Sequence, residues 1–242
     1  MLILYEYPFN ESIRTMLRLE HLFDRLGQLM ARDSALDHHY ALATIFEVMD
    51  VASRADLKSD LLKDLDRHRS QLNSYRGNPA ISEAALDEVI GRIDQAFSKL
   101  NQLPGKAGQV LTGNEWLMSI RGRTIIPGGA CEFDLPSYHA WQKNTTEKRF
   151  ADITAWFAPI APLFDAINVV LRLLRESGTT SKVIAQTGSY QQMLQGKVYQ
   201  LLRVNVARET GAIPEISANK YMLWIRFMSQ DGDMKPKAFE GD

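Results

Sequence analysis

The stretch NESIRTMLRLEHLFDRLGQLMAR, residues 10–32, predicts an amphipathic helix with an apolar face and a line of basic side chains. Spacings of 4, 3, 4 and 7 positions place five basic residues within roughly 60° of one another on such a helix. They are Arg14, Arg18, His21, Arg25 and Arg32, and we call them the basic line. No carboxylate falls inside that arc. The line therefore suits an anion or an acidic peptide, and a solvated helix face is the alternative.

The helical period of apolar residues recurs in later segments of the chain. Asn10 is the expected cap of the first helix. Further helices are expected over residues 35–51, 55–75, 82–103, 115–121 and 136–141. The strongest signal runs from Ile153 to Leu174 and predicts a long central helix. Because Pro159 and Pro162 fall inside it, this helix should kink or break near Ala158.

After Gly178 the pattern changes to the alternation of strands. Strands are expected over residues 182–186, 198–206 and 221–228, with short ones near 2–7 and 129–134. Helices followed by strands are typical of an α+β protein, here an N-terminal helical bundle and a mostly antiparallel β-domain. We expect the helical domain to comprise 9–112 and 145–177. The β-domain should comprise 1–8, 113–144 and 178–242.

Composition disfavours several classes of protein. The chain has 242 residues and a net charge of −1, which argues against bulk binding of nucleic acid, and no aromatic residue interleaves the basic line. No run of 18 apolar residues predicts a membrane span, and the first residues do not resemble a secretory signal. The single cysteine excludes an intrachain disulfide, which fits a reducing cytosol.

Catalytic and metal chemistry find little support in the residue pattern. Cys131 has Asp134 and His139 close by in sequence, so a thiol-dependent hydrolase using Cys131 and His139 is the alternative function. No nucleophile signature accompanies the cysteine, and a small buried side chain is the simpler interpretation. The adjacent His38 and His39 would point about 100° apart on a helix. We therefore predict no metal site and no cofactor.

Several collinear stretches carry a family resemblance. They are EYPFNE at 6–11, Ile13-Arg14-Thr15 with Leu17-Arg18, LLKDLDR at 61–67, IPGGAC followed by FDLP at 126–136, and IRFM at 225–228. Together they resemble the ZapD family of cell division proteins, and the resemblance spans nearly the whole chain. It implies a cytoplasmic, non-enzymatic homodimer with a helical domain and a β-domain, acting at the mid-cell division site. Its implied partner is FtsZ, the bacterial tubulin-like GTPase, and not a nucleic acid or a membrane.

The resemblance also implies how the contact is made. Such a protein binds the C-terminal tail of FtsZ, bundles its protofilaments and promotes Z-ring assembly. The matching basic positions are Arg18, Arg54, His139 and Arg226; Arg14 lies in a matched block too, where a structural role is the alternative. Glu115 and Met222 stand where the family pattern has arginines, which puts those two contacts in doubt.

Strand alternation adds a prediction for Arg226. It should face away from Leu223, Ile225 and Phe227, alongside Trp224 and Met228. A charge beside a large aromatic ring would suit peptide docking, and an arginine paired internally is the alternative. Arg25 and Arg32 have no family support, so we interpret them as a solvated face.

Overall fold

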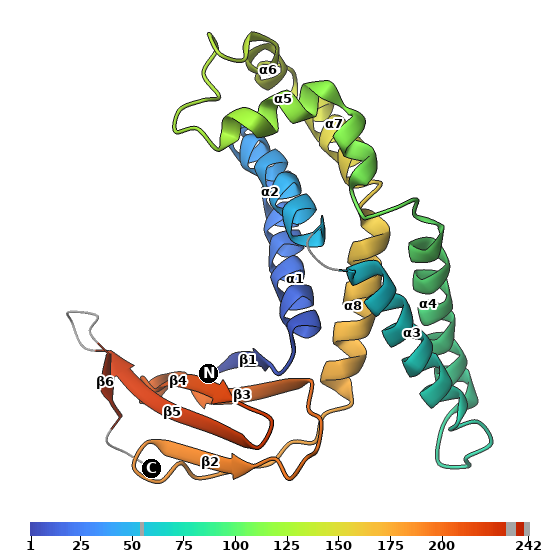
Figure 1. The fold of residues 1–242 in the computed structure, drawn as a ribbon, viewed down its shortest axis with the longest axis vertical. Coiled ribbons are helices and arrows are strands. Elements are labelled where there is room, and N and C mark those ends of the chain that lie inside the picture. The colour runs from blue at the N-terminus through green and yellow to red at the C-terminus, as the bar shows by residue number, and fades with distance from the viewer. Residues whose placement is uncertain (54–55, 231–235, 240–242) are drawn as a thin grey trace. The chain divides into compact units, whose positions relative to one another are not determined.

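The computed structural model describes residues 1–53, 56–230 and 236–239 (Figure 1). The chain divides into two compact units. One comprises Met1–Arg14 and Leu174–Asp242, and the other comprises Thr15–Leu173. We call them the β-unit and the helical unit. Arg54 and Ala55, and with them the predicted contact at Arg54, lie outside the described residues.

Eight α-helices occur in the described residues. Their bounds are α1 Glu11–Met30, α2 Ala35–Ser53, α3 Leu57–Asn73, α4 Glu83–Gln102, α5 Glu115–Thr124, α6 Pro136–Gln142, α7 Thr146–Phe157 and α8 Ala161–Glu176, with a short 3₁₀ turn, η1, at Gln109–Gly113. The cap expected at Asn10 is present. Oδ1 of Asn10 accepts a hydrogen bond from the Ile13 amide at 2.8 Å, and the Ser82 side chain caps α4.

The predicted break of the central helix is confirmed. α7 ends at Phe157 and α8 begins at Ala161, with a bend of 68° between their axes. Pro159 and Pro162 cannot donate the amide hydrogen bonds that would continue the helix. Among the described residues, no single helix is long and apolar enough to cross a membrane, although α7 and α8 would pass that test together.

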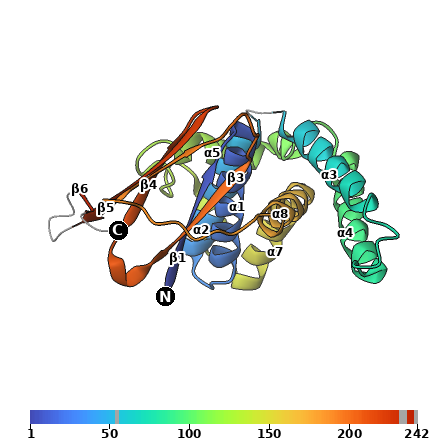
Figure 2. The ribbon, with the colours of Figure 1, turned by 90° about the horizontal axis from the view of Figure 1, so that it is seen from below.

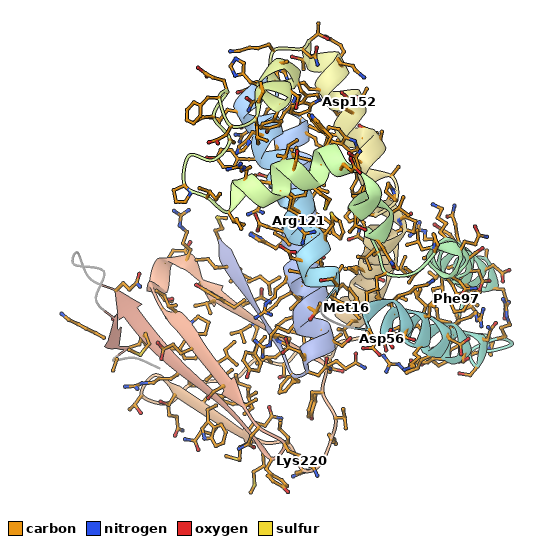
Figure 3. The ribbon with its side chains drawn as sticks, turned by 45° about the horizontal axis from the view of Figure 1, so that its top comes forward. Met16, Asp56, Phe97, Arg121, Asp152 and Lys220 are labelled. Carbon is orange, nitrogen blue, oxygen red and sulfur yellow. The ribbon has the colours of Figure 1, made fainter. Side chains whose placement is uncertain are left out.

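The helical unit is held together by the apolar faces of its helices. α3 and α4 lie side by side as a hairpin in two views (Figures 1 and 2). Leu61 and Leu65 of α3 and Ile93 of α4 are fully buried. At the exposed edge of this hairpin, the Arg69 guanidinium lies 5.4 Å from the centre of the Phe97 ring (Phe97 is labelled in Figure 3).

The strand predicted at 129–134 is wrong. These residues form consecutive turns, in which the amide of Gly129 donates to the Ile126 carbonyl and the amide of Asp134 donates to the Cys131 carbonyl. Gly128 has a φ of 71°, and a Cβ on Gly129 would lie 2.5 Å from the Arg123 carbonyl oxygen. The glycine pair therefore builds a tight turn rather than an entry into a strand.

Residues 113–144 lie in the helical unit, whereas we expected them in the β-domain. An aromatic cluster explains this placement. Trp116, Tyr138 and Trp141 pack on one another, and Trp116 and Trp141 also pack on Trp156 of α7, with ring centres 5.5 to 6.1 Å apart. The cluster ties α5 and α6 to α7 through apolar contact.

The β-unit contains two antiparallel sheets. β1 (Leu2–Pro8) pairs with β3 (Leu201–Ala207), and the second sheet has the order β2 (Ser189–Met193), β5 (Met222–Gln230), β4 (Ile213–Ala218), with β6 (Pro236–Ala238) also pairing with β5. The α+β class is thereby confirmed. The strand predicted at 182–186 is wrong, because pairing with β5 begins only at Ser189, after Gly188 with its φ of 70°.

A small core fills the β-unit. Leu194, Leu223 and Ile225 are buried, and side chains of β3 such as Leu202 and Val204 pack against them. Within the same unit, Arg175 donates to both carboxylate oxygens of Glu6 of β1, at 2.8 and 2.6 Å. Because Leu223 and Ile225 are buried, the inner face of β5 packs in the core, and only its outer face is open to a binding partner.

Candidate peptide-binding site

The basic line on α1 is largely paired with carboxylates. Arg14 Nε lies 3.2 Å from Glu11, Arg25 Nη2 lies 2.5 Å from Glu47 of α2, and Arg32 Nη1 lies 3.3 Å from Asp37. The arc itself holds no acid, but it receives carboxylates from Glu11 in the first turn of α1 and from α2. The exposed Arg32 agrees with the solvated-face interpretation, whereas Arg25 connects α1 to α2, and Arg14 has a local structural partner.

Arg18 and His139 lie at different ends of the helical unit. Arg18 is exposed in the first half of α1, 12 residues before its end at Met30, or about 18 Å along the axis. His139 is on α6, which packs near the start of α2: the Tyr138 hydroxyl lies 2.7 Å from Nδ1 of His39. Nδ1 of His139 lies 3.9 Å from Oε2 of Glu132. Within one chain the two predicted contacts are therefore separate points.

Arg226 lies on the outer face of β5, as predicted. Leu223 and Ile225 are buried on the inner face, whereas Arg226 is exposed and Trp224 is half-buried. The register places Ser189 of β2 and Glu215 of β4 on either side of Arg226. Within the described part of the chain, the Arg226 guanidinium makes no ion pair, so the alternative of an internally paired arginine finds no support there.

A shallow hollow of about 360 Å³ surrounds Trp224 and Arg226. Three strands line it, contributing Ser189, Tyr190 and Gln191 from β2, Glu215, Ile216 and Ser217 from β4, and Trp224, Ile225 and Arg226 from β5. We call this surface the β5 hollow. Sequence reasoning singled out Trp224 and Arg226 but missed the flanking residues, because only the strand register brings them alongside. A hollow with an aromatic wall and a cation can hold an extended peptide that carries a carboxylate.

The remaining predicted positions do not extend this surface. Glu115 is exposed in the first turn of α5, where a carboxylate suits the helix dipole. Met222 is half-buried at the start of β5, on the same face as Trp224. It adds apolar surface there in place of the expected charge.

The Cys131 alternative gains no support from the geometry. Cys131 is exposed in the turns before α6, and no hydrogen bond joins it to His139 in the residues that the structure describes. No group of three or more His, Cys, Asp or Glu side chains with metal-binding geometry occurs in the described ranges.

A buried polar pair lies apart from these surfaces. Arg149 and His38 are both buried, and Arg149 Nε donates to Nδ1 of His38 at 3.1 Å. Arg149 also donates to the Asp33 carbonyl at 2.8 Å. Burial and then the Arg149 charge lower the pKa of His38, while a hydrogen bond with the Arg32 backbone and the charges of Asp37 and Asp33 oppose the shift. The pair connects the turn between α1 and α2 to α7 and keeps His38 neutral.

Comparison with known proteins identifies relatives over the whole chain. The family described as "ZapD: Cell division protein" matches residues 17–226. The "Cell division protein ZapD" of Janthinobacterium sp. (strain Marseille) is 63% identical over 241 residues, covering 100% of this chain and 96% of that protein. The proteins of the same name in Ralstonia pickettii (strain 12J) and Ralstonia nicotianae (strain ATCC BAA-1114 / GMI1000) are 60% and 59% identical over 242 residues, with the same coverage.

Proposed function

The chain belongs to the ZapD family of cell division proteins, and from this premise we propose that it binds the C-terminal tail of FtsZ and bundles FtsZ protofilaments. Bundling would promote assembly of the Z-ring at the mid-cell division site in the cytoplasm. The proposal assigns the chain a binding role without catalysis and without a cofactor. Arg18, Arg54, His139 and Arg226 are the proposed contacts, with Arg14 as a further candidate.

The observation that carries this proposal is the position of Arg226. It is exposed on an open sheet face, beside the half-buried Trp224 and within the β5 hollow. An arginine binds a carboxylate through parallel, charge-assisted hydrogen bonds, and the neighbouring ring supplies apolar contact. A short acidic and apolar segment is the ligand that such a surface suits.

Cross-linking requires at least two such sites, which a homodimer supplies most simply. Each site can bind weakly, because a second contact on the same polymer benefits from a high effective concentration. Arg18 and His139 are far apart on one chain. In a dimer they can therefore contact different points of an extended tail.

Low-speed sedimentation of polymerised FtsZ tests the proposal. The wild-type chain should move FtsZ into the pellet as bundles, and Arg226→Glu should abolish that effect. Arg208→Glu is a matched control, because Arg208 is exposed in the same unit but lies outside the β5 hollow. Both variants should keep the wild-type circular dichroism spectrum. Equal bundling by the two variants would contradict the assignment of Arg226, and no bundling by the wild-type chain would contradict the proposed function.

A further inference from the structure

The β5 hollow has a repeat that an extended peptide can match. Trp224 and Arg226 lie two residues apart on one face of β5, a separation of roughly 7 Å at 3.2–3.4 Å per residue. An extended peptide has the same two-residue repeat on each of its faces. When it lies along β5, an apolar side chain can cover Trp224 while a carboxylate two residues away reaches Arg226.

The two sides of Arg226 differ in charge. Ser189 on β2 is its neighbour on one side, and its hydroxyl can donate to a carboxylate. Glu215 on β4 is its neighbour on the other side and repels any acidic group that approaches there. One carboxylate therefore fits on the β2 side, whereas a second one beside it would meet Glu215.

The surroundings of Trp224 leave its ring available as an anchor. Its cross-strand neighbours are Gln191 on β2 and Ser217 on β4, both polar and exposed. Met222 and Met193 form the next pair along the sheet, and Met193 is 72% exposed. Flexible methionine side chains and an aromatic ring accommodate apolar groups of various shapes.

We propose that Trp224 and Glu215 set the sequence preference of this surface. The preferred ligand is an extended protein segment with an apolar side chain two residues from a single carboxylate. The inference rests on the proposed function in taking the FtsZ tail as that segment. A nucleic acid or an anionic membrane fits poorly, because Glu215 cancels the charge that repeated phosphates need.

Binding of a synthetic FtsZ tail peptide to the full-length chain, measured by calorimetry, tests the inference. Trp224→Ala should weaken binding about fivefold or more, as for an interface residue that contributes measurably. Tyr221→Ala is the matched control: Tyr221 is an exposed aromatic residue outside the hollow, beside Lys220 in the turn between β4 and β5 (Lys220 is labelled in Figure 3). It should bind like the wild type.

A double-mutant cycle identifies the contact itself. The peptide's apolar residue two positions from its carboxylate is replaced by alanine. This replacement should weaken binding to the wild-type chain and make little difference with Trp224→Ala. Glu215→Gln should raise affinity for a peptide with an added second carboxylate by about fivefold relative to the wild-type chain, because it removes one repulsive charge. Additive losses at Trp224, or no change with Glu215→Gln, would overturn the inference.

Failure of the inference is distinct from failure of the proposed function. If the tail binds and the filaments bundle while Trp224→Ala behaves as wild type, only the inference is wrong. If the tail does not bind at all, the proposed function is wrong. In that case the sequence preference of the β5 hollow is measured with two synthetic hexapeptides. One has leucine and aspartate two residues apart, and the other has them adjacent. The first should shift the Trp224 indole resonance and the second should not; equal shifts, or none, would overturn the inference.

Discussion

The Nη2 atom of Arg25 lies 2.5 Å from Oε1 of Glu47, while its Nε donates to the Thr44 hydroxyl at 3.0 Å. Arg25 thus joins α1 to α2 and is not a free cation. Replacing it with alanine should lower the free energy of unfolding by about 1 kcal/mol, because the ion pair is partly exposed and one neutral hydrogen bond is lost. Urea unfolding followed by circular dichroism measures this. Bundling of FtsZ should be unchanged, and its loss in a stably folded variant would contradict the structural role.

Arg18 should behave differently from Arg32 on the same basic line. Arg18→Glu should reduce FtsZ bundling severely, since it reverses a charge at a proposed contact. Arg32→Glu serves as its control, because Arg32 is exposed and already faces Asp37. Sedimentation of FtsZ with each variant makes the comparison. If the two variants bundle FtsZ equally well, Arg18 is not a contact.

Acid should destabilise the chain through His38. Its pKa is lowered in the folded state, so below about pH 6.5 the unfolded chain takes up the proton first. The stability that neutral His38 contributes is present above that pH and is lost as the pH falls. His38→Gln keeps an acceptor for Arg149 without a titrating ring. The urea concentration at the unfolding midpoint of the wild type should decrease when the pH is lowered from 7 to 5. That decrease should be smaller in the variant. Equal falls would contradict this assignment.

Cys131→Ser separates the binding role from the hydrolase alternative. Cys131 is exposed in a turn, and serine has nearly the same size, so the fold should be unaffected. FtsZ bundling by the variant should equal that of the wild type in a sedimentation assay. A thiol-dependent activity that disappears in Cys131→Ser would revive the alternative.

Local signals predicted the helices well. Asn10 and Ser82 cap the helices that they precede, and Pro159 and Pro162 mark the break between α7 and α8, because capping and proline geometry act over a few residues. The prediction of a strand at 129–134 was wrong, because strand formation depends on more than local signals. A strand needs a distant partner, and the short alternation after Gly129 contains no information about one.

The candidate site was only partly predictable. The alternation of side chains predicted that Arg226 and Ile225 point to opposite faces of the sheet, which the structure confirms. The residues that flank it, Ser189 and Glu215, come from β2 and β4, and only the sheet register aligns them. In the same way, an arc free of acids on α1 did not reveal Glu47 of α2, because that pairing depends on helix packing rather than on helix periodicity.

Removal of the FtsZ tail is the sharpest test of whether the chain binds FtsZ through that tail. Polymerised full-length FtsZ and FtsZ without its C-terminal tail are each sedimented with the wild-type chain under identical salt conditions. The chain should bundle and cosediment with full-length FtsZ and should remain in the supernatant with the tail-less polymer. Equal cosedimentation with both polymers would contradict it.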